Sequence, residues 1–144
     1  MTSNEQLPQG TPAWLTMVGT LMREAAAQAG LPPSLTVSFV ERYTDGAALA
    51  DGLVQGLRFD ITGGQPSFRV GVRPDEAADI VVEVTAAAAR QLNALYSHDP
   101  DYAAALAEVL RTGDMRVVGD PAQLGPWLAA VHDPIVARTR PEGD

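Results

Sequence analysis

The stretch that decides the fold opens with Ala78-Asp79-Ile80-Val81-Val82-Glu83-Val84-Thr85 and closes with Gly113-Asp114-Met115-Arg116-Val117-Val118-Gly119-Asp120. The opening sequence is apolar on nearly both faces of an extended chain. It therefore predicts a strand over 79–84 that is central in a sheet and covered by helices. The closing sequence starts with a Gly-Asp turn, which predicts a short strand over 115–118.

The segment between these strands predicts two Ala- and Leu-rich helices. Thr85 is a typical N-cap for a helix over 86–96, and Pro100 begins a second helix that continues to about residue 111. The intervening Ser97-His98-Asp99 resembles a catalytic set only in composition, because adjacent side chains diverge and a triad needs them to converge. We interpret these residues as the segment that ends the first helix and begins the second, with Asp99 as the N-cap of the second helix.

The flanking sequence adds a helix, three strands and a final helix. Thr11-Pro12 begins a helix that Gly30 ends, and alternating residues predict a strand over 35–43. Strands over 53–61 and 68–72 are separated by a short Gly-rich turn, so they form an antiparallel hairpin. Asp120-Pro121 begins the last helix, which carries one apolar stripe.

Hairpin strands followed by grouped helices indicate an α+β fold. We expect a single, mostly antiparallel sheet of about five strands covered by helices. The domain is predicted over 11–133, with a disordered lead-in over 1–10 and a flexible tail over 134–144.

Composition excludes several classes of function. The net charge is −8, and the ten basic residues are all Arg and are scattered from Arg23 to Arg140. Such a surface repels nucleic acids and anionic lipid headgroups, so neither nucleic-acid binding nor stable membrane anchoring is expected. There is no cysteine and only two histidines, which leaves no recognisable metal site and favours a cytoplasmic protein. No cofactor motif is present, and Ala and Arg without Lys suggest a bacterial, GC-rich source.

The segments 78–85 and 113–120, two helices apart and preceded by the hairpin over 53–72, resemble the sterol carrier protein 2 (SCP2) domain. The first segment looks like that family's strand entering a helix. The second is similar to its Gly-x-Leu/Met-x-Val/Ile-x-Gly-Asp strand before the last helix. The resemblance implies a stand-alone bacterial SCP2-like domain that binds an apolar ligand in a tunnel between sheet and helices.

Candidate ligand-binding residues are large apolar side chains on the strands and helices that would enclose the tunnel. Taken singly, each is interpreted as an ordinary core residue, because every amphipathic helix buries an apolar stripe. The resemblance to the SCP2 domain favours the whole set as ligand-binding residues. They are Phe39, Leu57, Phe59, Leu92, Tyr96, Leu106, Leu110, Trp127 and Leu128.

Glu41 joins this set because strand alternation places it on the same face as Val37 and Phe39. A carboxylate there lies either in a cavity, with a raised pKa, or at an exposed or bulged strand end beside an Arg. We favour the pairing with Arg, because an unpaired buried carboxylate is costly.

The leading functional hypothesis is non-covalent binding or carriage of an apolar small molecule, such as a lipid, fatty acyl chain or sterol-like compound, with no enzymatic activity. One alternative is a protein-interaction module, such as a homodimer formed through apolar helix stripes. A second alternative is a small isomerase or cyclase that uses Glu41 in a cavity. No catalytic residue, metal or cofactor is assigned.

Overall fold

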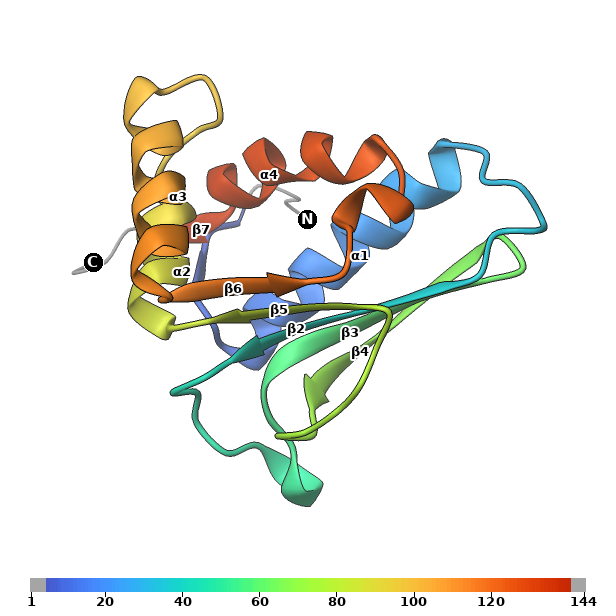
Figure 1. Cartoon of the computed structure of the whole chain (residues 1–144), viewed down its shortest axis with the longest axis horizontal. Helices are drawn as coiled ribbons and strands as arrows, with labels where there is room; N and C mark the ends of the chain where they lie inside the picture. Colours follow the sequence, from blue (N-terminus) through green and yellow to red (C-terminus); the bar gives the residue numbers. More distant parts are fainter. Residues whose placement is uncertain (1–4, 141–144) are drawn as a thin grey trace.

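A five-stranded mixed sheet with helices on one face organises the structure, a computed structural model that describes residues 5–140 (Figure 1). The strand order is β4-β3-β2-β5-β6, in which β2 and β5 run parallel and the other neighbours run antiparallel. This arrangement confirms the predicted α+β class and mostly antiparallel sheet. The strands are β2 (Val37–Tyr43), β3 (Val54–Thr62), β4 (Gln65–Val72), β5 (Ile80–Val84) and β6 (Met115–Val118).

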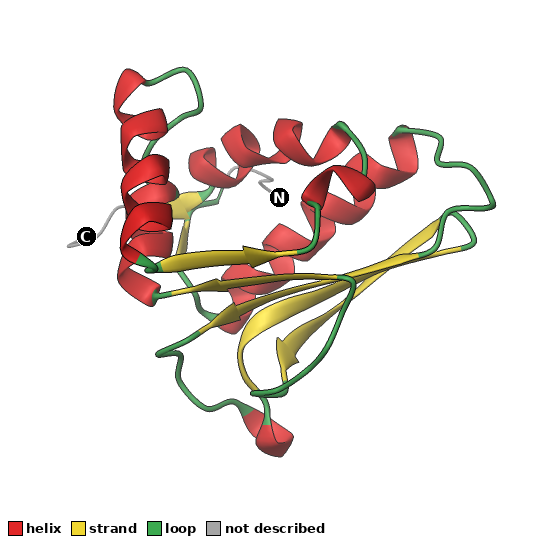
Figure 2. Ribbon diagram, viewed as in Figure 1, coloured by secondary structure: helices red, strands yellow, loops and turns green. Residues whose placement is uncertain are grey.

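The helices form two groups. Helices α1 (Pro12–Gln28) and α4 (Trp127–Ala137) pack against each other above the sheet, whereas α2 (Ala86–Leu92) and α3 (Pro100–Thr112) form a hairpin at one end of it (Figure 2). Two short 3-10 turns, η1 (Ala50–Gly52) and η2 (Pro121–Gln123), connect strands and helices. The helix pair between β5 and β6 is the one that the sequence predicts.

The helix boundaries follow from capping chemistry. The hydroxyl of Thr11 accepts a hydrogen bond from the Trp14 amide at 3.2 Å, and Thr85 caps α2 in the same way. The Asp99 carboxylate accepts from the Asp101 amide at 2.9 Å, which begins α3. Each cap satisfies a backbone donor that the first helical turn leaves free. The interpretation of Asp99 as a helix cap is confirmed.

Helix α2 ends at Leu92, four residues earlier than the predicted 86–96. The following turn is held by tertiary contacts instead of helical ones: the His132 ring bonds the Leu95 carbonyl at 2.8 Å, and Asp133 accepts from the Ser97 amide at 2.7 Å. Contacts from α4 therefore replace the last predicted helical turn.

The C-terminal segment also differs from the expectation. The final helix begins at Trp127, because Gly125 (φ 122°) and Pro126 separate it from η2. It then continues through Pro134, which we placed in a flexible tail over 134–144. Its end leads to β7 (Thr139–Arg140).

Strand β7 pairs in parallel with β1 (Leu7–Pro8), which lies in the predicted disordered lead-in over 1–10. The Trp14 indole donates to the Thr139 hydroxyl at 2.9 Å, so a buried side chain of α1 holds β7. The remaining parts of both predicted termini, 1–4 and 141–144, lie outside the described residues.

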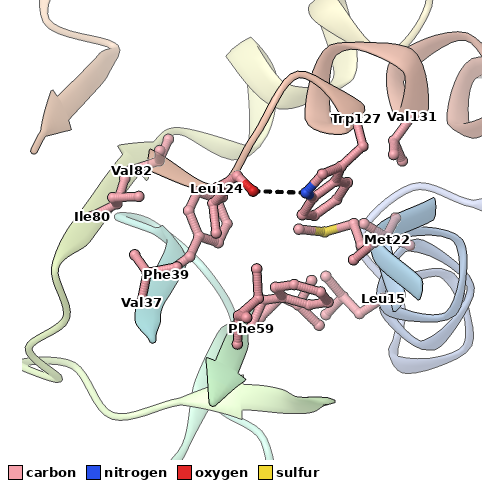
Figure 3. Close-up of a cluster of buried hydrophobic side chains, with 14 of the residues drawn as sticks. Leu15, Met22, Val37, Phe39, Phe59, Ile80, Val82, Leu124, Trp127 and Val131 are labelled. Atoms are coloured by element: carbon pink, nitrogen blue, oxygen red, sulfur yellow. Dashed lines mark hydrogen bonds between the residues drawn. The ribbon is translucent and has the colours of Figure 1, made fainter. Parts of the chain in front are cut away.

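Two hydrophobic clusters fill the protein. The first, which we call the sheet–helix core, lies between the sheet and α1, α4 and η2 (Figure 3). The second, the hairpin core, packs α2 and α3 against the ends of β2 and β5. In the sheet–helix core, the Trp127 indole donates to the Leu124 carbonyl at 2.7 Å, which satisfies a polar group in an apolar setting.

The loop that joins β4 to β5 contacts β2, β3 and β4 on the opposite face of the sheet. Glu76 in this loop pairs with Arg58 at 2.8 Å and also with Arg69, and Asp79 accepts from the Ser38 amide at 2.9 Å. Partly buried polar contacts therefore hold this loop against the face that the helices leave uncovered.

Gly19 allows α1 to lie directly on β4. A Cβ atom at Gly19 would stand 2.3 Å from Cδ2 of Phe68, too close for the two to coexist. We therefore predict that Gly19→Ala destabilises the protein by about 1–3 kcal/mol, although Ala favours helices over Gly by about 1 kcal/mol. Urea unfolding measures this difference.

Phe68→Ala provides the matched background for that test. With the ring removed, Gly19→Ala is expected to be neutral or stabilising, because only the helical preference remains. Stabilisation by Gly19→Ala in the wild-type background would contradict this account of the α1–β4 contact.

Candidate functional site

A small pocket lies where β2 and β3 meet α1, α4 and the residue that follows α2. Its volume is about 60 Å³. Most of the lining is apolar and comes from the two helices above the sheet and from β3: Trp14, Leu15, Val18, Leu57 and Ile135. The pocket therefore borders the sheet–helix core on one side.

Three polar side chains complete the lining: Glu41, Tyr43 and Asn93. Gly56 also contributes, at an irregularity in the β3–β4 pairing. A Cβ atom at Gly56 would stand 2.5 Å from the Glu41 carbonyl oxygen, so glycine permits the close strand approach here.

Glu41 is the group that sets the electrostatics of the pocket. It is partly buried, lines the pocket and lies on the sheet face that also carries the buried Phe39, as strand alternation predicts. Within residues 5–140, no hydrogen bond or ion pair reaches its carboxylate. Burial alone raises the pKa of Glu41 from 4.5 to about 7.

The favoured prediction for Glu41, an exposed or bulged strand end beside an Arg, is therefore wrong. The neighbouring Arg42 points to the other face of the sheet, where it pairs with Glu83 at 2.8 Å. The alternation of side chains along β2 places Arg42 on the face opposite Glu41, and the helices above Glu41 bring no basic side chain to the pocket lining.

Tyr43 supplies a neutral polar group beside Glu41. Its hydroxyl accepts a hydrogen bond from the Gln9 side-chain amide at 2.6 Å. Burial, and then the charge of Glu41, raise the pKa of Tyr43 well above its usual range, so the phenol stays protonated. The Gln9 Oε1 atom is buried and lacks a partner among the described residues.

A set of contacts joins the α2–α3 connection to α4 near the pocket. The Ser97 amide and hydroxyl each donate to the Asp133 carboxylate at 2.7 Å, and these bonds lower the pKa of Asp133. The ring of the adjacent His132 lies 4.5 Å from that of Tyr102. We call the Ser97–Asp133 and Leu95–His132 contacts the latch.

The structure distributes the ten predicted ligand residues over four places. Glu41 and Leu57 line the pocket. Phe39, Phe59, Trp127 and Leu128 belong to the sheet–helix core or pack against it, where the Phe59 and Trp127 rings lie 5.6 Å apart. Leu92 and Leu106 are part of the hairpin core, and Tyr96 and Leu110 are 40% and 46% exposed.

Sequence reasoning missed the α1 side of the pocket. Trp14 and Val18 form part of the apolar stripe of α1, but a stripe indicates burial and does not say that a space remains beside it. Tyr43 and Asn93 were missed as well, and Ile135 fell within the predicted tail.

The volume of the pocket limits what it accepts. A water needs roughly 10–15 Å³ of such space, whereas pockets for drug-sized ligands measure roughly 300–1,000 Å³. At about 60 Å³, the pocket admits the end of a ligand. A longer ligand requires neighbouring elements to separate.

Two further features of residues 5–140 constrain the site. This part of the chain contains no group of three or more His, Asp or Glu that could hold a metal ion. None of its helices is both long and apolar enough to cross a membrane.

No protein-family model matches the sequence, and no curated protein matches it. The fold, however, matches solved structures. The conserved hypothetical protein TT1886 of Thermus thermophilus aligns over 100% of both chains with a TM-score of 0.54 and 16% identity. A crystal structure of sterol carrier protein 2 aligns over 89% of this chain and 95% of its own, with a TM-score of 0.51 and 19% identity.

These alignments confirm, at the level of the fold, the resemblance inferred from 78–85 and 113–120. At such low identity they carry no residue role from one protein to the other. The chain has the fold of the sterol carrier protein 2 domain.

Proposed function

We propose that this protein binds an apolar small molecule non-covalently, with the ligand held between the sheet and the helices. Lipids, fatty acyl chains and sterol-like compounds belong to this class. The observation that carries the proposal is the position of the pocket: it lies at the seam between the sheet–helix core and the hairpin core. The fold supports the same function by analogy.

The lining suits an apolar ligand with one polar end. Five apolar side chains face the pocket, and each Å² of apolar ligand surface that they bury contributes roughly 25 cal/mol of affinity. Glu41, Tyr43 and Asn93 are grouped among them and can orient a polar group. A few polar groups in an apolar lining are typical of small-molecule sites.

A ligand larger than the pocket requires the α2–α3 hairpin to move. The hairpin has its own core and contacts the sheet mainly through Tyr43, Val84 and Met115. Movement along the seam would leave the sheet–helix core intact and would extend the pocket toward Leu92 and Leu106. Of these two residues of the predicted ligand set, Leu92 is buried and Leu106 is partly buried in the hairpin core.

We predict that linear alcohols bind with an affinity that depends on chain length. Each buried CH₂ group contributes about 0.8 kcal/mol, so 1-octanol should bind roughly 15-fold more tightly than 1-hexanol. Isothermal titration calorimetry measures both affinities. Equal affinity for the two alcohols would indicate surface adsorption and would contradict the proposal.

Filling the pocket should abolish this binding. Val18→Phe places a ring in the pocket and is expected to weaken 1-octanol binding by at least about tenfold, whereas Val118→Phe makes the same change on the exposed edge of β6. Unfolding curves show whether each variant remains folded. Unchanged octanol affinity in a folded Val18→Phe protein would place the ligand elsewhere.

The latch is expected to control the rate of ligand association. Asp133→Ala removes both hydrogen bonds to Ser97, so the hairpin should separate from α4 more readily. We predict a several-fold faster association of 1-octanol by stopped-flow fluorescence, with faster amide exchange over 93–99. Asp75→Ala, in the loop on the opposite face of the sheet, is the control and should change neither rate.

A further inference from the structure

We propose that the ligand is an amphiphilic amine whose ammonium group lies against Glu41 and whose apolar chain extends between the sheet and the helices. This inference rests on the proposed function and specifies the chemistry of the ligand's polar end. It starts from the carboxylate of Glu41, which is partly buried, lines a mostly apolar pocket and has no partner within residues 5–140.

Glu41 lacks a countercharge among the side chains that line the pocket. Glu41 has no hydrogen bond and no ion pair within residues 5–140. From α1 the pocket lining receives Trp14, Leu15 and Val18, from β3 Gly56 and Leu57, from α4 Ile135 and from the end of α2 Asn93. None of these side chains carries a positive charge. A bound cation would supply the partner that these elements do not bring to Glu41.

The pocket lining combines the Glu41 carboxylate with aromatic residues. The Trp14 and Tyr43 rings line the same pocket as Glu41. Aromatic faces attract ammonium groups through the quadrupole of the ring, and the attraction grows when water is excluded. Two aromatic rings and one carboxylate together are typical of ammonium recognition. They offer no comparable attraction to a neutral alcohol.

Other titratable and charged groups lie in or near the pocket. Tyr43 is the other titratable group in the lining, and its phenol is neutral. Arg90 of α2 and Asp45 act electrostatically on Tyr43 with opposite sign. Asp45 also accepts a hydrogen bond from the Ala86 amide at 2.8 Å. Among the described residues that line the pocket, Glu41 is therefore the one that can carry a formal charge at neutral pH.

Glu41 would discriminate between ligands by the charge of their headgroups. A carboxylate ligand, such as a fatty acid anion, would place a second negative charge beside Glu41, whereas an ammonium group would form a partly buried ion pair. The net charge of −8 favours the approach of cations. The pocket volume of about 60 Å³ suits an ammonium group with its first carbons.

Three probes of equal chain length test the inference: octylamine hydrochloride, 1-octanol and sodium octanoate, titrated by calorimetry at pH 8. We expect octylammonium to bind about 10- to 100-fold more tightly than 1-octanol, as a hydrogen bond to a charged group allows. Octanoate should bind more weakly than 1-octanol. Glu41→Gln should remove the preference for octylammonium and retain the binding of 1-octanol, and Glu24→Gln on the exposed surface of α1 should change neither.

The pH dependence provides a second readout. An alkylammonium, like the Lys side chain with its pKa of about 10.4, stays charged below pH 8. Glu41, with a pKa of about 7, must lose its proton to form the ion pair. Octylammonium affinity should therefore fall roughly 30-fold from pH 8 to pH 5.5, whereas that of 1-octanol should not fall.

The outcomes separate this inference from the proposed function. Binding of 1-octanol without a preference for octylammonium, or a preference that survives Glu41→Gln, overturns the amine assignment and leaves apolar binding standing. Absence of binding by all three probes overturns both. A preference that depends on Glu41 and on pH supports both.

Discussion

The constraint on which the structure depends is that one face of the sheet is apolar and must be covered. Helices α1 and α4 cover most of it, with Trp14, Phe59 and Trp127 filling the space between the layers. The cover is incomplete above Glu41, where a pocket of about 60 Å³ remains between two helix groups. A carboxylate in that position is costly for the folded protein, and this cost links the architecture to the function.

The position of Glu41 makes the stability of the protein depend on pH. The pKa of Glu41 is raised on folding from 4.5 to about 7, so the folded state retains a proton that the unfolded state loses. Stability is unaffected below pH 4.5 and falls as the pH rises toward 7, by roughly 3 kcal/mol in total. An apolar side chain at position 41 would avoid this loss. A carboxylate with a perturbed pKa in a pocket is a candidate for a functional group.

Much of the fold could be predicted from local patterns. Alternation and turn chemistry predicted the strand over 115–118 and the antiparallel pair of strands β3 and β4. Asp99-Pro100 predicted the start of α3. The errors arose where tertiary contacts decide. Helix α2 stops at Leu92 because α4 binds the next turn, and α4 passes through Pro134 because the chain beyond it is held by Trp14. No local signal in the sequence indicates either contact.

The candidate site was less accessible to sequence reasoning than the fold. Alternation along β2 placed Glu41 on the correct face. Its lack of a partner among the described residues depends on which side chains α1, α4 and the end of α2 bring to the pocket. Large apolar residues such as Phe59 and Trp127 were natural candidates for a ligand surface, and the structure packs them against each other. The pocket instead uses Val18 and Ile135, whose patterns are those of ordinary core residues.

The state of Glu41 in the protein without ligand tests the central claim most directly. A carboxyl ¹³C NMR titration of selectively labelled protein, with Glu41→Gln to assign the resonance, measures the pKa of this side chain. The account predicts a midpoint near 7. A midpoint at 4.5 or below is the result expected for a solvated or ion-paired glutamate. It would show that Glu41 is not an unpaired group in a mostly apolar pocket.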